Sequence, residues 1–204
     1  VSAGEALPPQ IAKGFKEKAG LDILDGIGST EMLHIFLSNR PKDFRYGTTG
    51  KAVPGYELRL VDEQGKLVKQ GELGELEMSG PTSAMYYWNN RAKSRSTFVG
   101  EWTRSGDKYT LDADGFYAYG GRTDDMLKVS GIWVSPAEVE AALVSHEAVL
   151  EAAVVGKEDE QKLVKPKAYV VLKNGAQATD DELKAHVKAK LAPQGIDIVT
   201  SSPQ

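Results

Sequence analysis

Two short sequences predict helix starts in the last third of the chain, SPAE at residues 135–138 and TDDE at residues 179–182. In each of them a hydroxyl residue stands at the N-cap position and a glutamate follows at N3, which is the reciprocal pairing of a capping box. The proline of SPAE suits the first helical position, where the missing amide proton has no intrahelical partner. The segments AVLEAAVVG and KAYVVL between them have the composition of strands. Residues 125–193 are therefore predicted to form a small βαββα domain.

A different pattern, of short strand-like segments joined by glycine turns, runs through residues 46–121. YELRLVD, GELGELEMSG and FYAYGG alternate with the turns EQGK and DADG, which predicts an antiparallel β unit. DADG resembles part of a calcium loop, but the further acidic ligands of an EF-hand do not follow at the required spacing, so we interpret it as a turn. We interpret the aromatic run MYYW at residues 85–88 as packing.

The first forty residues predict one helix and a glycine-rich loop. Apolar residues recur at helical spacing between residues 8 and 18, on the face of Ile11, Ala12 and Phe15. The sequence LDILDGIGSTE that follows predicts a short buried strand that runs into the loop. EMLHIFL, which overlaps its end, fits either a helix or a strand.

Composition excludes several functional classes. Asp and Glu outnumber Lys and Arg by 29 to 25, so the chain lacks the basic excess of a nucleic-acid-binding protein. Without cysteine there is no disulfide, thiolate nucleophile or Cys-based zinc site, which fits a cytoplasmic protein. We also expect no membrane association, because no run of 18 apolar residues and no signal-peptide pattern is present. The chain begins with Val, from which we expect a fragment.

The glycine-rich loop DGIGSTE has the residue types of a phosphate-binding loop. Gly26 and Gly28 allow a ligand to approach the backbone closely, and Ser29 and Thr30 offer hydroxyl groups to phosphate oxygens. Glu31 offers a hard oxygen ligand to Mg²⁺. The alternative is a glycine turn with polar caps, and the loop by itself does not decide between the two.

Two further segments contain charged residues on glycine-rich loops. In TRSGDKY the carboxylate of Asp107 can accept both hydroxyl groups of a ribose, although a solvated turn acid is the alternative. In YGGRTDDMLKVSG the guanidinium of Arg122 is a planar donor, and the pair Asp124 and Asp125 suits a swivel between the β unit and the small domain. The alternative for this segment is a polar surface linker.

The order of these motifs resembles one family. SAGEALP, DGIGSTE, TRSGDKY and GGRTDDMLKVSGIWVSPAEVE follow one another as they do in the adenylate-forming superfamily of acyl- and aryl-CoA ligases. The resemblance covers the chain to about Pro193, and GSTEMLHIFLSN together with KVSGIWVSPAEVE looks most like the benzoate–CoA ligase branch. A purely structural β-plus-α domain would have to match all four motifs by accident.

The resemblance implies a mixed α/β (α+β) fold in two parts. Residues 1–122 would be the end of the large AMP-binding domain, with its antiparallel β unit at about 46–121. Residues 123–193 would be a small α+β lid domain, truncated, after a hinge at Asp124. The tail at 194–204 does not resemble the family.

The resemblance also implies roles for individual residues. The adenine and AMP-binding segments would be Gly4, Glu5, Ala6, Asp25, Gly26, Ile27, Gly28, Ser29 and Thr30. Asp107 would bind the ribose, Arg122 the ribose and phosphate, and Glu31 the magnesium ion. Ile27 and His34 would border the aryl pocket, with a buried core histidine as the alternative for His34. Ser130 and Gly131 would line the pantetheine tunnel. The residues implied in catalysis would be Thr30, Glu31, Asp124 and Lys128.

The implied reaction is ATP-dependent activation of an aromatic carboxylate to an acyl-AMP, followed by transfer to coenzyme A. The cofactors would be ATP/AMP, Mg²⁺ and coenzyme A, and homo-oligomer formation stays open. The family's upstream phosphate loop and its C-terminal lysine match no part of the sequence, so we expect this chain by itself to be inactive in adenylation. Two alternatives remain: an adenylate-forming enzyme that feeds a carrier protein, and a non-catalytic nucleotide-binding module.

Overall fold

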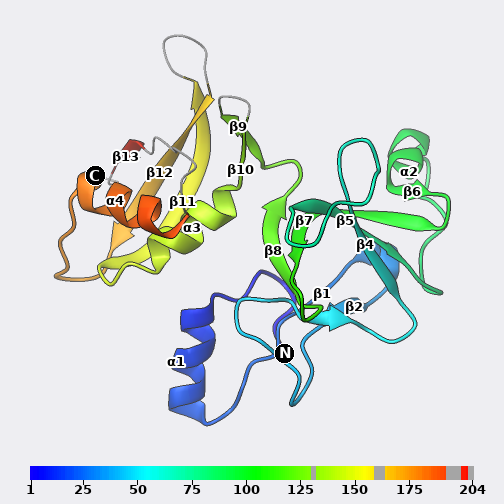
Figure 1. Cartoon of the computed structure of the whole chain (residues 1–204), viewed down its shortest axis with the longest axis horizontal. Coiled ribbons are helices and arrows are strands. Elements are labelled where there is room, and N and C mark those ends of the chain that lie inside the picture. Colours follow the sequence, from blue (N-terminus) through cyan, green and yellow to red (C-terminus); the bar gives the residue numbers. More distant parts are fainter. Residues whose placement is uncertain (130–131, 159–163, 192–198, 202–204) are drawn as a thin grey trace. The chain divides into compact units, whose positions relative to one another are not determined.

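The computed structural model describes residues 1–129, 132–158, 164–191 and 199–201 (Figure 1). The chain divides into two compact units, Val1–Thr123 and Asp124–Gln204. Each unit has its own cluster of buried apolar side chains. They are therefore described separately, as a first and a second unit.

The first unit consists of two antiparallel sheets and short helices. One sheet has the order β1-β2-β3, and the other has the order β4-β5-β7-β6 with β8 added to β7. Its elements are α1 (Pro9–Ala19), β1 (Gly26–Gly28), the 3-10 helix η1 (Thr30–Met32), β2 (Ile35–Ser38), β3 (Lys51–Ala52), β4 (Glu57–Val61), β5 (Gly74–Ser79), α2 (Arg91–Thr97), β6 (Phe98–Val99), β7 (Trp102–Leu111) and β8 (Tyr117–Arg122).

The core of the first unit joins η1 and β2 to the larger sheet. Apolar side chains of β2, β4 and β5 pack with two tyrosines of β7 and β8, whose rings meet edge to face with centroids 6.4 Å apart. Burial of these side chains stabilises the unit, at about 25 cal/mol for each Å² of apolar surface removed from water. The buried members are Met32, Phe36, Leu37, Leu60, Leu76, Met78, Tyr109 and Tyr117.

The second unit packs two helices on a small sheet, as Figure 1 shows for α3 and α4 beside β11 and β12. The two helix starts predicted from SPAE and TDDE are confirmed. The Ser135 hydroxyl accepts a bond from the Glu138 amide at 3.2 Å, and Thr179 and Glu182 form a complete capping box. The elements are β9 (Leu127–Val129), β10 (Ile132–Val134), α3 (Pro136–Val144), β11 (Val149–Glu158), β12 (Val164–Leu172), α4 (Asp180–Lys190) and β13 (Val199–Ser201).

Three segments differ in detail from what the sequence suggests. The run EMLHIFL is neither a helix nor a strand throughout, because η1 ends at Met32, Leu33 takes a positive φ of 72° and β2 begins at Ile35. On α1 only Ala12 of the predicted face is buried, whereas Ile11 and Phe15 are exposed. In the segment 194–204, β13 pairs with β12 in parallel.

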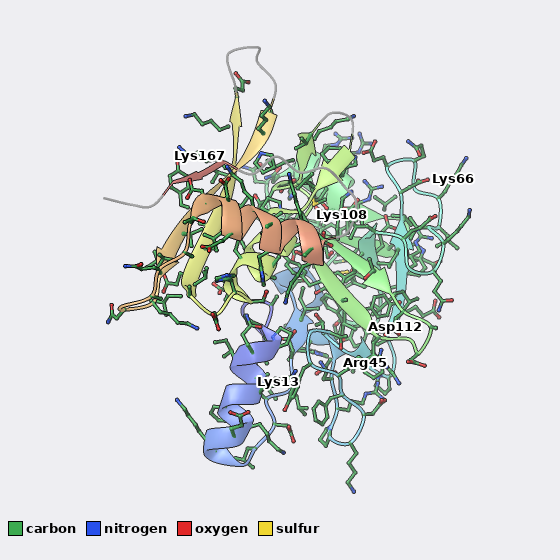
Figure 2. All side chains as sticks on the ribbon, turned by 60° about the vertical axis from the view of Figure 1, so that its left-hand side comes forward. Lys13, Arg45, Lys66, Lys108, Asp112 and Lys167 are labelled. Carbon is green, nitrogen blue, oxygen red and sulfur yellow. The ribbon has the colours of Figure 1, made fainter. Side chains whose placement is uncertain are left out.

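The DADG sequence forms the predicted turn. The Asp112 carboxylate accepts bonds from the amides of Asp114 and Phe116, both at 2.9 Å, and Gly115 takes the positive φ of 83° that glycine tolerates. Figure 2 shows Arg45 beside Asp112, and its guanidinium bonds both acidic side chains of the turn. Asp112 and Asp114 therefore both form ion pairs with Arg45, which hold the turn against the segment that contains Arg45.

Candidate nucleotide site

Asp107 and Arg122 stand directly opposite each other on the paired strands β7 and β8. The Arg122 Nη1 atom donates to Asp107 Oδ1 at 3.0 Å and to the Ser105 carbonyl oxygen at 3.2 Å. Asp107 is buried and Arg122 is exposed. The pair therefore presents one anionic acceptor and one cationic donor fork from two neighbouring strands, which is chemistry suited to a hydroxyl group next to a phosphate.

A glycine makes room for this pair. Gly106 has a positive φ of 74°, and a Cβ atom added there would lie 2.9 Å from Arg122 Nη2. Its carbonyl oxygen accepts the Thr123 amide at 2.8 Å, and the Ser105 hydroxyl accepts the Asp107 amide at 2.9 Å. Serine thus fixes the amide of the acid, and the positive φ of Gly106 favours glycine at this position.

The protonation of Asp107 depends on two opposing effects. Burial raises the pKa of its carboxyl, while the charge and hydrogen bond of Arg122 and the Ser105 hydroxyl oppose that shift, and burial prevails. A ribose hydroxyl that donates to this carboxylate would add a further bond to the charged form. A ligand that donates hydrogen bonds through uncharged hydroxyl groups therefore suits the Asp107 carboxylate.

Glu31 is held on η1 by a residue that sequence analysis did not select. Its Oε1 accepts a hydrogen bond from the Tyr87 hydroxyl, and Ser29 caps η1 by accepting the Met32 amide at 3.3 Å. Burial alone would raise the pKa of Glu31, but the bonds from Tyr87 and Ser29 and the charge of Lys93 outweigh it, so this pKa lies below its usual value. Glu31 is consequently an anion at neutral pH.

The aromatic run at 85–88 therefore does not serve as packing throughout. Tyr87 bonds Glu31, whereas Met85, Tyr86 and Trp88 are exposed by 83%, 57% and 87%. A pocket of about 330 Å³ lies next to this run and is lined by Tyr86, Tyr87, Asn89, Asn90, Arg91, Ser94 and Arg95. The sequence contains no local signal for the bond from the Tyr87 hydroxyl to Glu31, because the two residues are 56 positions apart.

Asp25 is buried beside the N-terminal segment. An isolated bridge joins it to Ser2, whose amide donates to the Leu24 carbonyl oxygen at 2.9 Å. The bridge places Ser2 beside Asp25, and the exposed segment Gly4, Glu5 and Ala6 follows Ser2 in the sequence. The Asp25 Oδ1 atom is buried without a hydrogen-bond partner in the described part of the chain. An unsatisfied buried acceptor of this kind suits a ligand that donates a hydrogen bond.

Asp25 makes the stability of the first unit depend on pH. Burial raises its pKa to about 6, against bonds from the Gly26 and Leu7 amides and the Thr49 hydroxyl. Since the folded pKa lies above the unfolded value, the folded state holds a proton that the unfolded state has lost, and its stability falls as pH rises from about 4 to 6. We expect a loss on the order of 2 kcal/mol. Urea unfolding at several pH values should show this slope, and Asp25→Asn should remove it; an unchanged slope in that variant contradicts the assignment.

Residues 26–28 of the glycine-rich loop pack closely against the backbone of β2 and His34. Gly26, Ile27 and Gly28 form β1 against β2, and a Cβ atom at Gly28 would lie 2.6 Å from the His34 carbonyl oxygen. Thr30 begins η1. Gly28 therefore lies in a strand and not in a turn, and its close packing against the backbone of His34 leaves no room for a side chain.

His34 is exposed, so the alternative of a buried core histidine is wrong. Its Nδ1 lies 2.8 Å from the Ile35 carbonyl oxygen and its Nε2 lies 2.8 Å from the Tyr56 hydroxyl. The ring also meets the Tyr56 ring edge to face, with centroids 5.5 Å apart. These contacts fix the orientation of the imidazole.

The predicted residues of the first unit fall into two clusters that share β7. Asp107 pairs with Arg122 in one cluster, and burial together with the charges of Asp107 and Asp25 raises the pKa of the neighbouring Tyr109. Glu31 lies in the other cluster, where its carbonyl oxygen accepts the Ala84 amide at 2.7 Å and Ser83 bonds Thr103 at 2.7 Å. Thr103 and Asp107 are both on β7, and the positive φ of Gly106 interrupts the extended backbone between them.

The predicted residues of the second unit are described in part. Asp124 and Lys128 are exposed, and the Lys128 Nζ lies 5.4 Å from the centre of the Trp133 ring, within cation–π range. Ser130 and Gly131 lie outside the described residues. In the described ranges there is no group of three or more side chains able to hold a metal ion. Nor does any helix in those ranges have the length and apolarity needed to span a bilayer.

Comparison with known families matches both units. The model of the AMP-binding enzyme family matches residues 1–88, and the model of the AMP-binding enzyme C-terminal domain matches residues 138–201. The second match includes β13. Together the two models cover well over half of the chain.

Curated relatives and solved structures agree with the family models. The chain is 63% identical over 196 residues to a benzoate–CoA ligase of Thauera aromatica, and it covers 37% of that protein. A benzoate CoA ligase structure from Burkholderia xenovorans LB400 matches 98% of the chain with a TM-score of 0.88 and 57% identity. An anthranilate CoA ligase in complex with anthranoyl-AMP matches all of it with a TM-score of 0.86 and 50% identity. The chain spans 41% of each of these two structures.

Proposed function

Because the chain belongs to the family of AMP-binding enzymes, we propose that the protein is an ATP-dependent ligase that joins an aromatic, benzoate-like carboxylic acid to coenzyme A. The identity of 63% to a benzoate–CoA ligase carries this proposal, together with the opposed Asp107 and Arg122 side chains. In the first half-reaction the substrate carboxylate attacks the α-phosphate of ATP and pyrophosphate leaves. In the second, the thiol of coenzyme A displaces AMP and gives the thioester.

The side chains of β7 and β8 would bind the nucleotide. Asp107 would accept the ribose hydroxyl groups and Arg122 would donate to the ribose and phosphate, which is the chemistry that their pairing supports. The segments Gly4–Ala6 and 25–30 would lie along adenine and AMP, and the unsatisfied Asp25 Oδ1 is an acceptor suited to an amino group. The protein contributes position and charge here, with no nucleophile of its own.

Mg²⁺ fits Glu31. The carboxylate is anionic and partly buried, and Mg²⁺ commonly binds one or two carboxylates together with substrate phosphates and water. The ion would neutralise phosphate charge, and Tyr87 would orient the carboxylate that holds it. Thr30, beside it on η1, would contribute its hydroxyl to the same site.

Four further roles rest on family grounds, three of them in the second unit and one in the first. Asp124, where the second unit begins, would be the hinge between the two half-reactions, and Lys128 would act in the second. Ser130 and Gly131 would line the pantetheine tunnel. His34 and Ile27 would border the aryl pocket.

Product analysis tests the proposal. The natural gene product, supplied with benzoate, ATP, Mg²⁺ and coenzyme A, is expected to form benzoyl-CoA, AMP and pyrophosphate in equal amounts. Transfer to a carrier-protein thiol in preference to coenzyme A would contradict the assigned acceptor. Nucleotide binding without acid-dependent release of pyrophosphate would contradict the ligase activity and indicate a binding module.

A further inference from the structure

The buried hydroxyl of Thr49 connects the two sheets of the first unit. Thr49 is 3% exposed, and its amide donates to the Tyr117 carbonyl oxygen on β8 at 2.8 Å. Its hydroxyl oxygen lies 3.4 Å from the hydroxyl oxygen of Tyr109 on β7. The same Thr49 hydroxyl forms a hydrogen bond with the carboxyl of Asp25, the residue that directly precedes β1. Thr49 therefore links the larger sheet to the acid at the start of the smaller one.

The buried Asn39 holds the backbone around Thr49 against the backbone of Asp25. The Asn39 amide donates to the Asp25 carbonyl oxygen at 2.9 Å, and the Asn39 Nδ2 atom donates to the Thr48 carbonyl oxygen at 2.6 Å. Gly50 has a positive φ of 101°, and a Cβ atom added there would lie 2.1 Å from the Asn39 amide nitrogen. The backbone itself therefore places the Thr49 hydroxyl beside the Asp25 carboxyl.

The donors and acceptors along this contact allow only one order. An ionised carboxyl can only accept, so Thr49 donates its single hydroxyl proton to Asp25. The Thr49 oxygen can then accept from Tyr109, although this contact is long. Burial, together with the charges of Asp107 and Asp25, raises the pKa of Tyr109, so its hydroxyl keeps the proton that it donates. Because Asp25 Oδ1 has no partner in the described part of the chain, the bond from Thr49 reaches the other carboxyl oxygen, Oδ2.

We propose that Thr49 is a positioning residue, which holds Oδ2 of the Asp25 carboxylate and leaves Oδ1 for a donor group of the ligand. The amides of Gly26 and Leu7 bond the same carboxyl, and no cationic side chain of the described residues is among its partners. Tyr109 on β7 is the titratable group that faces it. A buried acceptor without a donor is unfavourable, so a ligand that supplies the donor gains binding free energy.

The identity of that donor rests on the proposed function. Adenine carries an exocyclic amino group, which donates hydrogen bonds, whereas hypoxanthine and guanine carry at the same ring position a carbonyl oxygen, which only accepts. A carbonyl oxygen opposite Asp25 Oδ1 would bring two acceptors together and leave both without a donor. Thr49 would thus contribute, through Asp25, to the selection of adenine nucleotides over those with a carbonyl at that position.

Carbon NMR of the ¹³C-aspartate-labelled chain tests the contact between Thr49 and Asp25, whose signal is identified by its loss in Asp25→Asn. Thr49→Val should raise the Asp25 titration midpoint, expected at about 6 in the parent, on the order of one pH unit, because the carboxylate loses a donor. Thr49→Ser keeps the hydroxyl and should restore the parent midpoint. Thr48→Val is the matched control: the Thr48 hydroxyl donates to the Arg45 carbonyl oxygen at 2.9 Å, so its loss should leave the midpoint unchanged.

Calorimetry of the natural gene product with AMP and with inosine monophosphate, which has a carbonyl in place of the amino group, forms a second arm. The parent should prefer AMP, and Thr49→Val should reduce this preference roughly threefold to tenfold, whereas Thr49→Ser and Thr48→Val should keep it. An unchanged Asp25 midpoint in a folded Thr49→Val variant overturns the positioning role, and an unchanged preference for AMP overturns its consequence for the ligand. A parent that binds neither nucleotide contradicts the proposed function, while the midpoint still tests Thr49, so the two failures are distinguishable.

Discussion

Replacing Asp107 with alanine is expected to weaken AMP binding on the order of 10²-fold, because in the proposed site its carboxylate would accept charge-assisted hydrogen bonds from the ribose. The loss includes a second effect, since Arg122 loses the oxygen that orients it at 3.0 Å. Titration calorimetry of the natural gene product with AMP measures the affinity directly. Asp107→Asn, which keeps the shape but not the charge, should give an intermediate loss.

An exposed acid of the same unit provides the matched control. Asp43 pairs with Lys51 on the surface at 3.0 Å, the same distance as between Arg122 and Asp107. Asp43→Ala therefore removes a comparable ion pair at a position that has no proposed contact with the nucleotide. Its AMP affinity should stay within twofold of the parent, because exposed pairs contribute little. Parent-like affinity in a folded Asp107→Ala variant contradicts the ribose assignment, whatever the activity of the enzyme.

Local signals in the sequence predicted both helix starts of the second unit, whereas the βαββα prediction has one strand before the first helix and the structure has two, β9 and β10. Helix caps depend on a few adjacent residues, so Ser135 and Thr179 could be identified without knowledge of the fold. The DADG turn is another local feature, since Asp112 bonds amides within four residues of itself. These predictions needed no partner from a distant part of the chain.

Burial was predicted less well, because it depends on what lies opposite. The spacing of Ile11 and Phe15 correctly identifies the apolar side of α1, but in the described part of the chain their side chains remain exposed. Periodicity shows which face is apolar and says nothing about the element that covers it. The same reason explains the aromatic run at 85–88, where apolar character suggested packing.

The candidate site required both kinds of information. Family resemblance selected Asp107 and Arg122, and the register of β7 and β8 shows how fifteen residues of separation place them opposite each other. Tyr87 lies 56 residues from Glu31, and Tyr56 lies 22 residues from His34, so their contacts have no sequence pattern. Such partners become visible only when the chain is folded.

Removing Glu77 is expected to cause the largest loss of stability, about 3 kcal/mol for Glu77→Ala. This carboxylate is 1% exposed in the middle of the larger sheet, where the register places it between Arg59 on β4 and Arg104 on β7. Both arginines donate to it, at 2.7 and 3.0 Å, and Arg59 also lies 4.0 Å above the Trp102 ring. Without the acid, two neighbouring cations repel each other and a cavity remains in the sheet.

The two units make the measurement specific. Each has its own core, so urea unfolding should show the Glu77→Ala effect in the transition of residues 1–123 and not in that of the second unit. In a Trp133→Phe background the remaining tryptophans, Trp88 and Trp102, both belong to the first unit, so fluorescence follows its transition alone. Glu57→Ala, at the exposed start of β4, should change the same transition by less than about 0.5 kcal/mol. The arginines are each about one-third exposed and can regain water, which keeps the expected loss at the lower end for broken buried pairs. Equal midpoints for Glu77→Ala and Glu57→Ala would therefore mean that the three-residue row across β4, β5 and β7 does not stabilise the sheet.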